Sequence, residues 1–196
     1  MQEMNEQHFL NNIFKAQDFS AEERDIIFPK FKQVSFSKND FLLQEGTTEN
    51  YYWFVESGFV RSYVVDTEGN DISTNFYSTG DIVIDWTSFF LRNPTRENIQ
   101  ALTDCVCWQL DFDTFQTLFH NIRSFREQGR TTLVSSYFSL KQQSVSMIAD
   151  QAKDRYLRLM KEKPHVIQNV SLKHIASFLG ITDTSLSRLR KEISEE

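Results

Sequence analysis

The stretch from Val170 to Ile193, VSLKHIASFLGITDTSLSRLRKEI, contains two short helical patterns separated by a glycine. In the first pattern Ser171 is a predicted N-cap, and apolar residues follow at the i, i+3, i+4 and i+7 positions of one stripe: Leu172, Ile175, Ala176 and Leu179. Gly180 can adopt the positive φ that ends a helix, and the Thr182 hydroxyl can cap the next one. The sequence therefore predicts two helices joined by a short, defined turn.

The second helix is predicted to have an apolar side and a polar side. At about 100° per residue, Leu186, Leu189 and Ile193 fall together, and the opposite side carries the polar set Thr184, Ser187, Arg188 and Lys191. This arrangement is typical of a helix-turn-helix, in which the second helix enters the major groove of DNA. An ordinary pair of packed amphipathic helices has the same pattern, so that alternative stays open at this point.

The distribution of charge favours the DNA interpretation. The whole chain has a net charge of −6, but residues 151–196 carry nine Lys or Arg against six Asp or Glu, a net +3, which leaves −9 for residues 1–150. A basic module neutralises phosphate, and an acidic remainder limits indiscriminate binding to nucleic acid. The asymmetry therefore supports a sequence-selective DNA-binding module at the C-terminal end.

The composition indicates a cytoplasmic protein with a sizeable core. The chain has 196 residues, 40% apolar and 14% aromatic, with 18 phenylalanines. No apolar run is long enough to cross a bilayer, and the start MQEMNEQH lacks the order of a signal peptide. We expect no membrane partner. Cys105 and Cys107 project to one face of a predicted strand, and we expect both to pack in the core without redox or metal duty.

Residues 30–110 read as short strands separated by turn-forming residues, which predicts an antiparallel barrel or roll. The predicted strands are Phe31–Phe36, Phe41–Leu43, Tyr51–Val55, Phe59–Val65 and Ile72–Tyr77. The turns are expected at Glu56-Ser57-Gly58, Glu68-Gly69-Asn70-Asp71 and Thr79-Gly80-Asp81. Helices are expected at Glu3–Ala16, at Ala21–Phe28 and from Phe112 onward.

A long helix is predicted between the strands and the C-terminal module. A stripe with the seven-residue rhythm of a helix that packs along a partner helix runs through Leu133, Tyr137, Leu140, Ser144 and Met147. The stripe predicts a homodimer, although it would also suit a helix that covers the roll. The predicted organisation is therefore a roll with flanking helices (1–120), a long central dimerisation helix (121–150) and a DNA-binding module (151–196).

This order of elements resembles the Crp/Fnr superfamily of bacterial transcription regulators over nearly the whole chain. The residues that carry the resemblance are Tyr52–Arg61 (YWFVESGFVR), the Gly80-Asp81 turn and, most specifically, Ile175–Lys191. The resemblance implies an α+β fold with a cyclic-nucleotide-binding-like β-roll. It also implies a DNA-binding transcription regulator that binds a palindromic operator as a homodimer, with RNA polymerase as a partner at the promoter.

The DNA-contacting positions of the family can be carried over to this sequence. The major-groove contacts fall on Asp183, Thr184 and Arg188, with Ser185 and Lys191 beside them, and the phosphate contacts fall on Ser171, Lys173 and Thr182. The guanidinium of Arg188 suits this role independently, because it can donate two hydrogen bonds to guanine O6 and N7.

The cyclic-nucleotide site of the family transfers poorly. Its Gly-Glu pair falls on Ile84-Asp85, and its Arg-Ser pair falls on Thr95-Arg96. The side chain of Ile84 limits the close backbone approach that glycine permits, and Arg96 is displaced by one residue to the opposite face of a strand. Trp86 would fill part of the pocket. We therefore expect a degenerate pocket, formed by Asp85, Trp86, Thr95 and Arg96, that does not respond to cyclic AMP and has either no effector or an unknown small-molecule one.

Other function classes have weaker support. A small-molecule-binding module whose C-terminal helices contact protein is the alternative to DNA binding. We expect no enzyme and no metal or other cofactor, because the sequence has no clustered metal ligands, N-terminal cysteines for an iron-sulfur cluster, paired haem ligands or known catalytic motif. The family's usual strands after the second helix are not expected, so that a DNA-binding wing would have to come from residues 165–170.

Overall fold

The computed structural model describes residues 2–195, with the side chains of residues 8–195. The strands are β1 (Lys32–Phe36), β2 (Phe41–Leu43), β3 (Tyr51–Ser57), β4 (Val60–Val65), β5 (Asp71–Tyr77), β6 (Ile82–Val83), β7 (Asn98–Ala101) and β8 (Cys105–Asp111). The helices are α1 (Gln2–Ile13), α2 (Ala21–Ile27), the 3-10 turn η1 (Phe28–Lys30), α3 (Trp86–Leu91), α4 (Phe112–Asn121), α5 (Arg123–Ala149), α6 (Ala152–Glu162), α7 (Pro164–Asn169), α8 (Leu172–Phe178) and α9 (Asp183–Glu195). The α+β architecture predicted from the sequence is confirmed.

The strands form two antiparallel four-stranded sheets, in the orders β1-β8-β3-β6 and β2-β7-β4-β5. Their inner faces meet in an aliphatic core that includes Val55, Val60 and Ile99, each with no exposed surface. Cys105 and Cys107 lie in this core as free thiols, as predicted. Gly58 has a φ of +95°, and a Cβ there would lie 2.5 Å from the carbonyl oxygen of Asp104, so the turn before β4 requires glycine.

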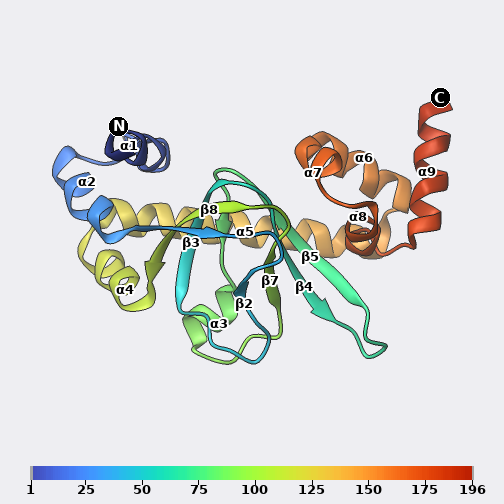
Figure 1. Ribbon diagram of the computed structural model, residues 1–196, viewed down its shortest axis with the longest axis horizontal. Helices are drawn as coiled ribbons and strands as arrows, with labels where there is room; N and C mark the ends of the chain where they lie inside the picture. The colour runs from blue at the N-terminus through green and yellow to red at the C-terminus, as the bar shows by residue number, and fades with distance from the viewer. Residues whose placement is uncertain (1, 196) are drawn as a thin grey trace.

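Helices close one end of the roll through an aromatic cluster. Phe14 has no exposed surface, and its ring centroid lies 5.2 Å from that of Phe19, 5.8 Å from Phe54 and 6.1 Å from Phe125. These rings join the segment after α1 to β3 and to the first turn of α5. Figure 1 shows the result, with α1, α2 and α4 at one end of the molecule and α6–α9 at the other. The abundance of phenylalanine is thus explained largely by one interface.

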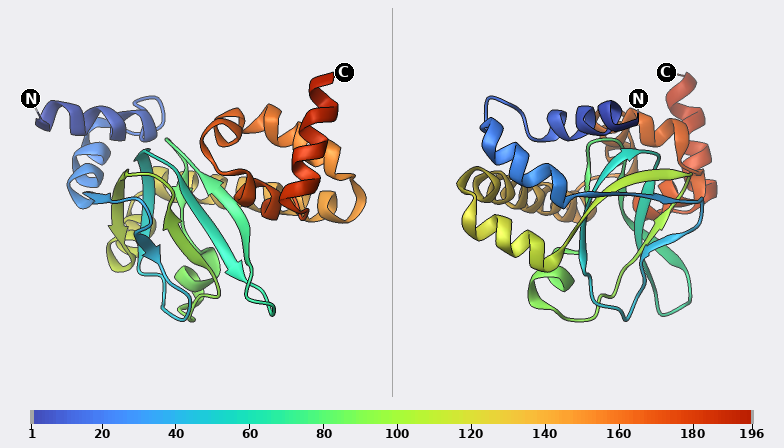
Figure 2. Two further views of the ribbon diagram at one scale, coloured as in Figure 1. Left: turned by 45° about the vertical axis from the view of Figure 1, so that its right-hand side comes forward. Right: turned by 60° about the vertical axis from the view of Figure 1, so that its left-hand side comes forward.

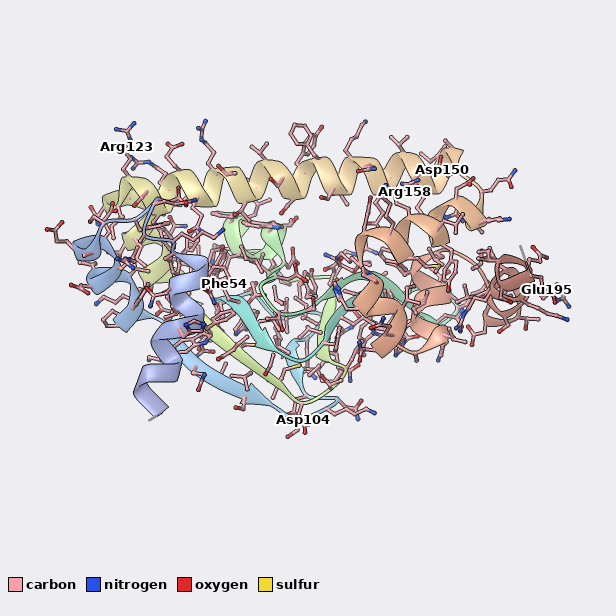
Figure 3. All side chains as sticks on the ribbon, turned by 90° about the horizontal axis from the view of Figure 1, so that it is seen from above. Phe54, Asp104, Arg123, Asp150, Arg158 and Glu195 are labelled. Atoms are coloured by element: carbon pink, nitrogen blue, oxygen red, sulfur yellow. The ribbon has the colours of Figure 1, made fainter. Side chains whose placement is uncertain are left out.

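The long helix α5 runs along the roll and connects the two ends (Figures 1 and 2). The side chains of the predicted stripe are exposed, from 43% at Met147 to 65% at Leu140, so they do not cover the roll. A second exposed stripe, one residue further along, was missed in the sequence: Val134, Phe138, Val145 and Ile148. Figure 3 shows side chains of α5 that project away from the roll. The helix therefore exposes a broad apolar face, and the edge of that face formed by Leu133, Tyr137, Leu140 and Met147 also lines the cleft beside the roll.

The C-terminal helices have their own core, to which the roll contributes Phe76 and the partly buried Leu102. This core contains Ile175, Ala176 and Leu186 without exposed surface, together with Phe76 of β5, whose ring centroid lies 5.3 Å from that of Phe178. The expectation that residues 165–170 could form a wing is wrong, because Pro164 begins the helix α7 and Val166 is buried in the core.

Candidate nucleic-acid interface and ligand pocket

The helix-turn-helix has the caps that the sequence predicted. The Ser171 hydroxyl accepts a hydrogen bond from the His174 backbone N–H at 3.4 Å, and the Thr182 hydroxyl accepts one from Ser185 at 3.2 Å. Gly180 has a φ of +67° between the two helices. The backbone N–H groups at the start of each helix are therefore fixed in direction, which is the local geometry that allows a helix terminus to approach a phosphate.

Helix α9 is docked by its apolar side, as predicted. Leu186 is fully buried, and Leu189 and Ile193 pack against the same core. The opposite face is exposed and carries Thr184, Ser187, Arg188 and Lys191. Within residues 2–195 the Arg188 guanidinium forms no ion pair, whereas Lys191 lies 3.8 Å from Glu195. The exposed cation and hydroxyls can therefore donate hydrogen bonds to a partner.

The eight predicted DNA-contacting residues all lie on this module, but they do not form one continuous set. Thr182, Asp183, Thr184, Ser185, Arg188 and Lys191 lie along α9 and its cap, and all are exposed. Ser171 and Lys173 lie in the first turn of α8. The Nζ of Lys173 is 3.9 Å from the Oδ1 of Asp71 on β5, so this lysine faces the roll. The individual contacts with DNA remain predictions.

The degenerate pocket predicted from the sequence is organised around Asp85. This carboxylate caps α3 by accepting hydrogen bonds from the backbone of Thr87 at 2.9 Å and Ser88 at 3.2 Å. It also accepts a 2.6 Å hydrogen bond from the hydroxyl of Thr95, which is 4% exposed. The two segments predicted to form the pocket, Ile84-Asp85 and Thr95-Arg96, are thus joined by a hydrogen bond from Thr95 to Asp85.

Trp86 and Arg96 have different positions. Trp86 is half-buried, lines the cleft beside Asp85 and stacks on Phe90 at 5.9 Å between ring centroids. Arg96 is exposed, and it is not among the described residues that line the cleft. Asp85, Trp86 and Thr95 therefore lie close together, and the participation of Arg96 in a ligand site stays a prediction.

The cleft itself has a volume of about 890 Å³ and lies between the roll, α5 and the C-terminal helices. Its roll side carries Asp85 and Glu97, and burial together with the nearby charge of Asp85 raises the pKa of Glu97. Its far side carries Arg158, which is paired with Asp150 (Figure 3), and Lys163, whose Nζ donates to the Phe76 carbonyl at 2.9 Å. The cations of the cleft are engaged by the protein, and its roll side is acidic.

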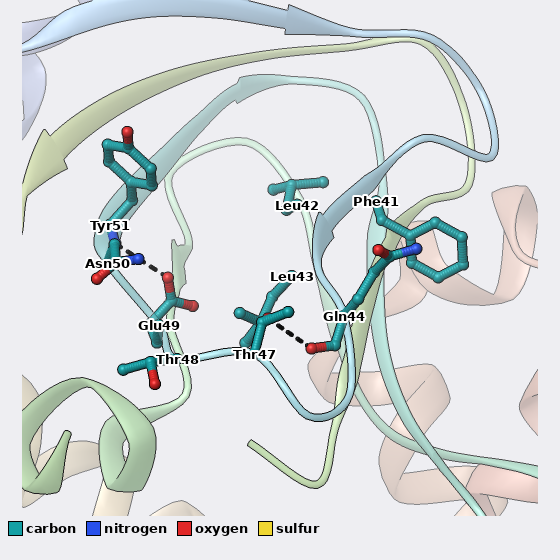
Figure 4. Close-up of a pocket in the computed structure, with 9 residues that line it drawn as sticks. All are labelled: Phe41, Leu42, Leu43, Gln44, Thr47, Thr48, Glu49, Asn50 and Tyr51. Carbon is teal, nitrogen blue, oxygen red and sulfur yellow. Dashed lines mark hydrogen bonds between the residues drawn. The ribbon is translucent and has the colours of Figure 1, made fainter. Parts of the chain in front are cut away.

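A buried carboxyl behind Asp85 was missed in the sequence. Glu49 has no exposed surface, its Oε1 accepts a hydrogen bond from the Tyr51 backbone at 3.0 Å, and its Oε2 has no partner among the described residues. Burial raises its pKa to about 8, and the charge of Asp85 adds to that effect. Figure 4 shows Glu49 beside a hollow of about 250 Å³ formed by β2 and the loop to β3. Only its position after a Gly-Thr-Thr turn marks it in the sequence.

No group of three or more His, Cys, Asp or Glu side chains among the described residues could hold a metal ion. No helix among them is long and apolar enough to cross a membrane.

Comparison with known proteins defines the class of this fold. Residues 33–121 match the model of the cyclic nucleotide-binding domain family. Over 109 residues the chain is 28% identical to the cAMP-dependent protein kinase regulatory subunit of Candida albicans, and it spans only 22% of that protein. The roll is therefore a domain of the cyclic-nucleotide-binding type.

The similarity to regulators extends over most of the chain. The anaerobic regulatory protein of Haemophilus influenzae is 22% identical over 188 residues, which are 90% of this chain and 71% of that protein. Among solved structures, FixK2 of Bradyrhizobium japonicum superposes with a TM-score of 0.73 at 16% identity, over 84% of this chain and 85% of that one. A CooA variant of Carboxydothermus hydrogenoformans gives 0.67 at 21% identity, over 85% and 78%. Together these findings show that the chain is similar to these regulators over most of its length and shares the fold of the two solved structures.

Proposed function

We propose that this protein is a cytoplasmic, DNA-binding transcription regulator that acts as a homodimer and not as an enzyme. The observation that carries the proposal is the outer face of α9, where Arg188 is exposed without an ion-pair partner in the described chain while Leu186 anchors the helix in the core. The relatives that align over most of the chain are regulators by name. RNA polymerase as a partner is proposed only from the resemblance to the family.

The exposed face of α5 supports the dimer. Phe138 and Leu140 are 63% and 65% exposed, and Ile148 is 86% exposed. Exposed apolar side chains in this number along one helix mark an interaction surface. A two-fold axis along α5 would pair this face with itself, and it would present two copies of α9 for half-sites about 34 Å apart.

An experiment on DNA binding tests the proposal. The purified full chain is used to select sequences from a pool of random duplexes, and the enriched sequence is expected to be a palindrome with half-sites about one helical turn apart. Binding of the selected duplex is then measured by fluorescence anisotropy at several salt concentrations, and the affinity is expected to fall as salt rises. If no sequence is enriched, the proposal fails.

Two arginine variants separate base recognition from general charge. Arg188→Ala is expected to cost about 1–3 kcal/mol and to relax specificity at one position of each half-site. Arg190→Ala is the matched control, because this arginine is also exposed on α9 but projects beside the docked side near Leu186. The control is expected to weaken binding only slightly and uniformly across sequences. Equal behaviour of the two variants would contradict the assignment of Arg188.

We also propose that the roll does not bind cyclic nucleotides. At the expected phosphate position Thr95 donates its hydrogen bond to Asp85, and Glu97 adds a second carboxylate nearby. An anionic cyclic phosphate would therefore meet like charge at this position. Thermal shift with cyclic AMP and cyclic GMP is expected to leave the melting temperature unchanged, and a rise of several degrees with either nucleotide would refute this proposal. Ligand binding without DNA binding would instead support a sensor module with a protein partner.

A further inference from the structure

The hollow beside Glu49 is separate from the larger cleft, because the two share no lining residue within the part of the chain that the structure describes. It has a volume of about 250 Å³ and is formed by β2 and by the loop that leads from β2 to β3. This volume is smaller than that of pockets for drug-sized ligands, so the hollow suits a molecule of few atoms.

Contacts on both sides of its backbone hold Glu49 in place. Its backbone N–H donates to the Ser88 hydroxyl of α3 at 2.9 Å, and its carbonyl accepts a hydrogen bond from the guanidinium of Arg92. The side-chain Oε1 accepts a hydrogen bond from the Tyr51 backbone N–H at 3.0 Å. Figure 4 shows the second carboxyl oxygen directed away from Tyr51, toward the side of the hollow where Thr47 lies. The carboxyl is therefore fixed with one oxygen aimed into the hollow.

That second oxygen, Oε2, has no hydrogen-bond partner among the described residues, and Glu49 has no exposed surface. A buried acceptor without a partner costs the free energy of its desolvation, which a donor that reaches it would recover. The charged groups near Glu49 are Asp85 at the N-cap of α3 and Arg92 at its C-cap. Arg92 donates to the Glu49 carbonyl and to Asn50 Oδ1, so it supplies no donor to Oε2.

The other groups of the hollow select a cation with a short apolar part. Among the described residues that line it, none is Lys, Arg or His. The Thr47 hydroxyl donates its proton to the Gln44 carbonyl at 2.6 Å, so toward a ligand it can only accept. The rings of Phe41 and Tyr51 and the side chain of Leu42 can cover a hydrocarbon chain, and aromatic faces attract cations. An ammonium group, with three donors and no acceptor, fits this set.

We propose that this hollow binds a small primary ammonium ion with a short hydrocarbon chain, which donates to Glu49 Oε2 and to Thr47 Oγ1. The site lies outside the DNA-binding module. Because the carboxyl has no exposed surface, the exposed side chains of Gln44 and Thr47 must shift to admit the ligand. Butylammonium is the probe, and tetramethylammonium is the matched control, since it has the same charge but no N–H donor.

Binding is measured by isothermal titration calorimetry of the full chain near neutral pH, in two buffers with different enthalpies of ionisation. Burial raises the pKa of Glu49 to about 8, so its carboxyl is mostly protonated under these conditions. An ammonium ion favours the ionised carboxylate, so binding should release nearly one proton and the observed enthalpy should depend on the buffer. The affinity should rise about tenfold from about pH 6 to about pH 7 and level off above about pH 8.

Three variants separate Glu49 from other carboxylates. Glu49→Gln removes the charge with little change of shape and should weaken butylammonium binding by about tenfold or more, because a hydrogen bond to a charged group is lost. Glu45→Gln is the matched control, since Glu45 is exposed in the same loop and is not among the described residues that line the hollow. Thr47→Val keeps the carboxyl, so it should weaken binding and leave the proton release unchanged. Urea unfolding establishes that each variant is folded.

Several results would overturn the site. If tetramethylammonium binds as tightly as butylammonium, or if Glu49→Gln and Glu45→Gln lose affinity equally, the ligand is attracted by general negative charge. An enthalpy that does not depend on the buffer would place the ligand on a carboxylate that is already ionised, which also refutes the assignment to Glu49. Absence of a heat of binding at millimolar butylammonium refutes the site itself. These measurements are made without DNA, so their failure leaves the proposed function intact.

Discussion

The exposed face of α5 gives a prediction whose magnitude can be worked out from the structure. Leu140 is 65% exposed and Phe138 is 63% exposed. Full burial of such a side chain contributes about 1.5–3 kcal/mol, so the exposed two thirds are worth about 1–2 kcal/mol in an interface. A two-fold dimer contains each substitution twice. Leu140→Ala or Phe138→Ala should therefore weaken the dimer by about 2–4 kcal/mol, which corresponds to about a 30- to 700-fold rise in the dissociation constant.

Sedimentation equilibrium over a range of concentrations measures this dissociation constant directly. The matched control is Leu91→Ala, because Leu91 is also 65% exposed but belongs to a different helix, α3. Circular dichroism and urea unfolding of each variant establish that the substitutions leave the protomer folded. The control should dimerise like the wild type.

Two results would refute this account of α5. If both α5 variants keep the dissociation constant of the wild type, the exposed face is not the dimer interface. If Leu91→Ala weakens the dimer as strongly as Leu140→Ala, apolar exposure rather than position on α5 determines the effect. If only Phe138→Ala weakens the dimer, α5 still forms the interface, but the contact is made by the second stripe, which contains Phe138 and Ile148.

Other predictions concern single residues. Gly180→Ala should lower the free energy of unfolding in urea by about 1–2 kcal/mol, because the positive φ of Gly180 disfavours a Cβ and the Met147 methyl, 2.8 Å away, must move. Gly69 has a similar φ but open surroundings, so Gly69→Ala should leave DNA binding unchanged. Glu49 has its pKa raised from 4.5 to about 8, so the folded state binds the extra proton. The free energy of unfolding should decline as the pH rises from 4.5 to about 8, and above about pH 8 the stabilisation from protonated Glu49 should be lost. The free energy of unfolding of Glu49→Gln should depend less on pH. Burial, followed by the nearby Arg61, lowers the pKa of His174. The folded chain favours the neutral form of His174, so the free energy of unfolding of the wild type should fall as the pH drops below about 6.5, and that of His174→Gln should fall less.

The helix-turn-helix could be predicted from sequence because its signals are local. Ser171, Gly180 and Thr182 act within three residues of themselves, as caps or as a positive-φ turn, and the structure confirms each. The burial of Leu186 follows from the same short-range periodicity. The strands of the roll were found for a similar reason, since the turn residues between them bracket each one.

The remaining features depend on contacts between distant parts of the chain. Glu49 is buried by packing around β3 and α3, and Arg61 meets His174 across 113 positions, so no spacing rule identifies either. The second stripe of α5 was missed because its members follow the first by one residue, and only the direction in which the roll lies shows that both are exposed. The prediction of a wing is wrong because Val166 is buried in the core of the C-terminal helices, and its local sequence does not show this burial.

Strand β5 gives a physical route by which the cleft and the C-terminal helices can influence each other. Side chains alternate along a strand, so Ser73 faces α8 while its neighbour Thr74 lines the cleft. The Thr74 carbonyl accepts a 3.5 Å hydrogen bond from Gln143 of α5, and the Phe76 carbonyl accepts one from Lys163 of α6. The strand that contacts α8 therefore forms part of the wall of the cleft. The effect of a bound molecule on DNA binding would depend on whether it binds more tightly to one arrangement of the C-terminal helices than to another, since equal affinity for both would shift nothing.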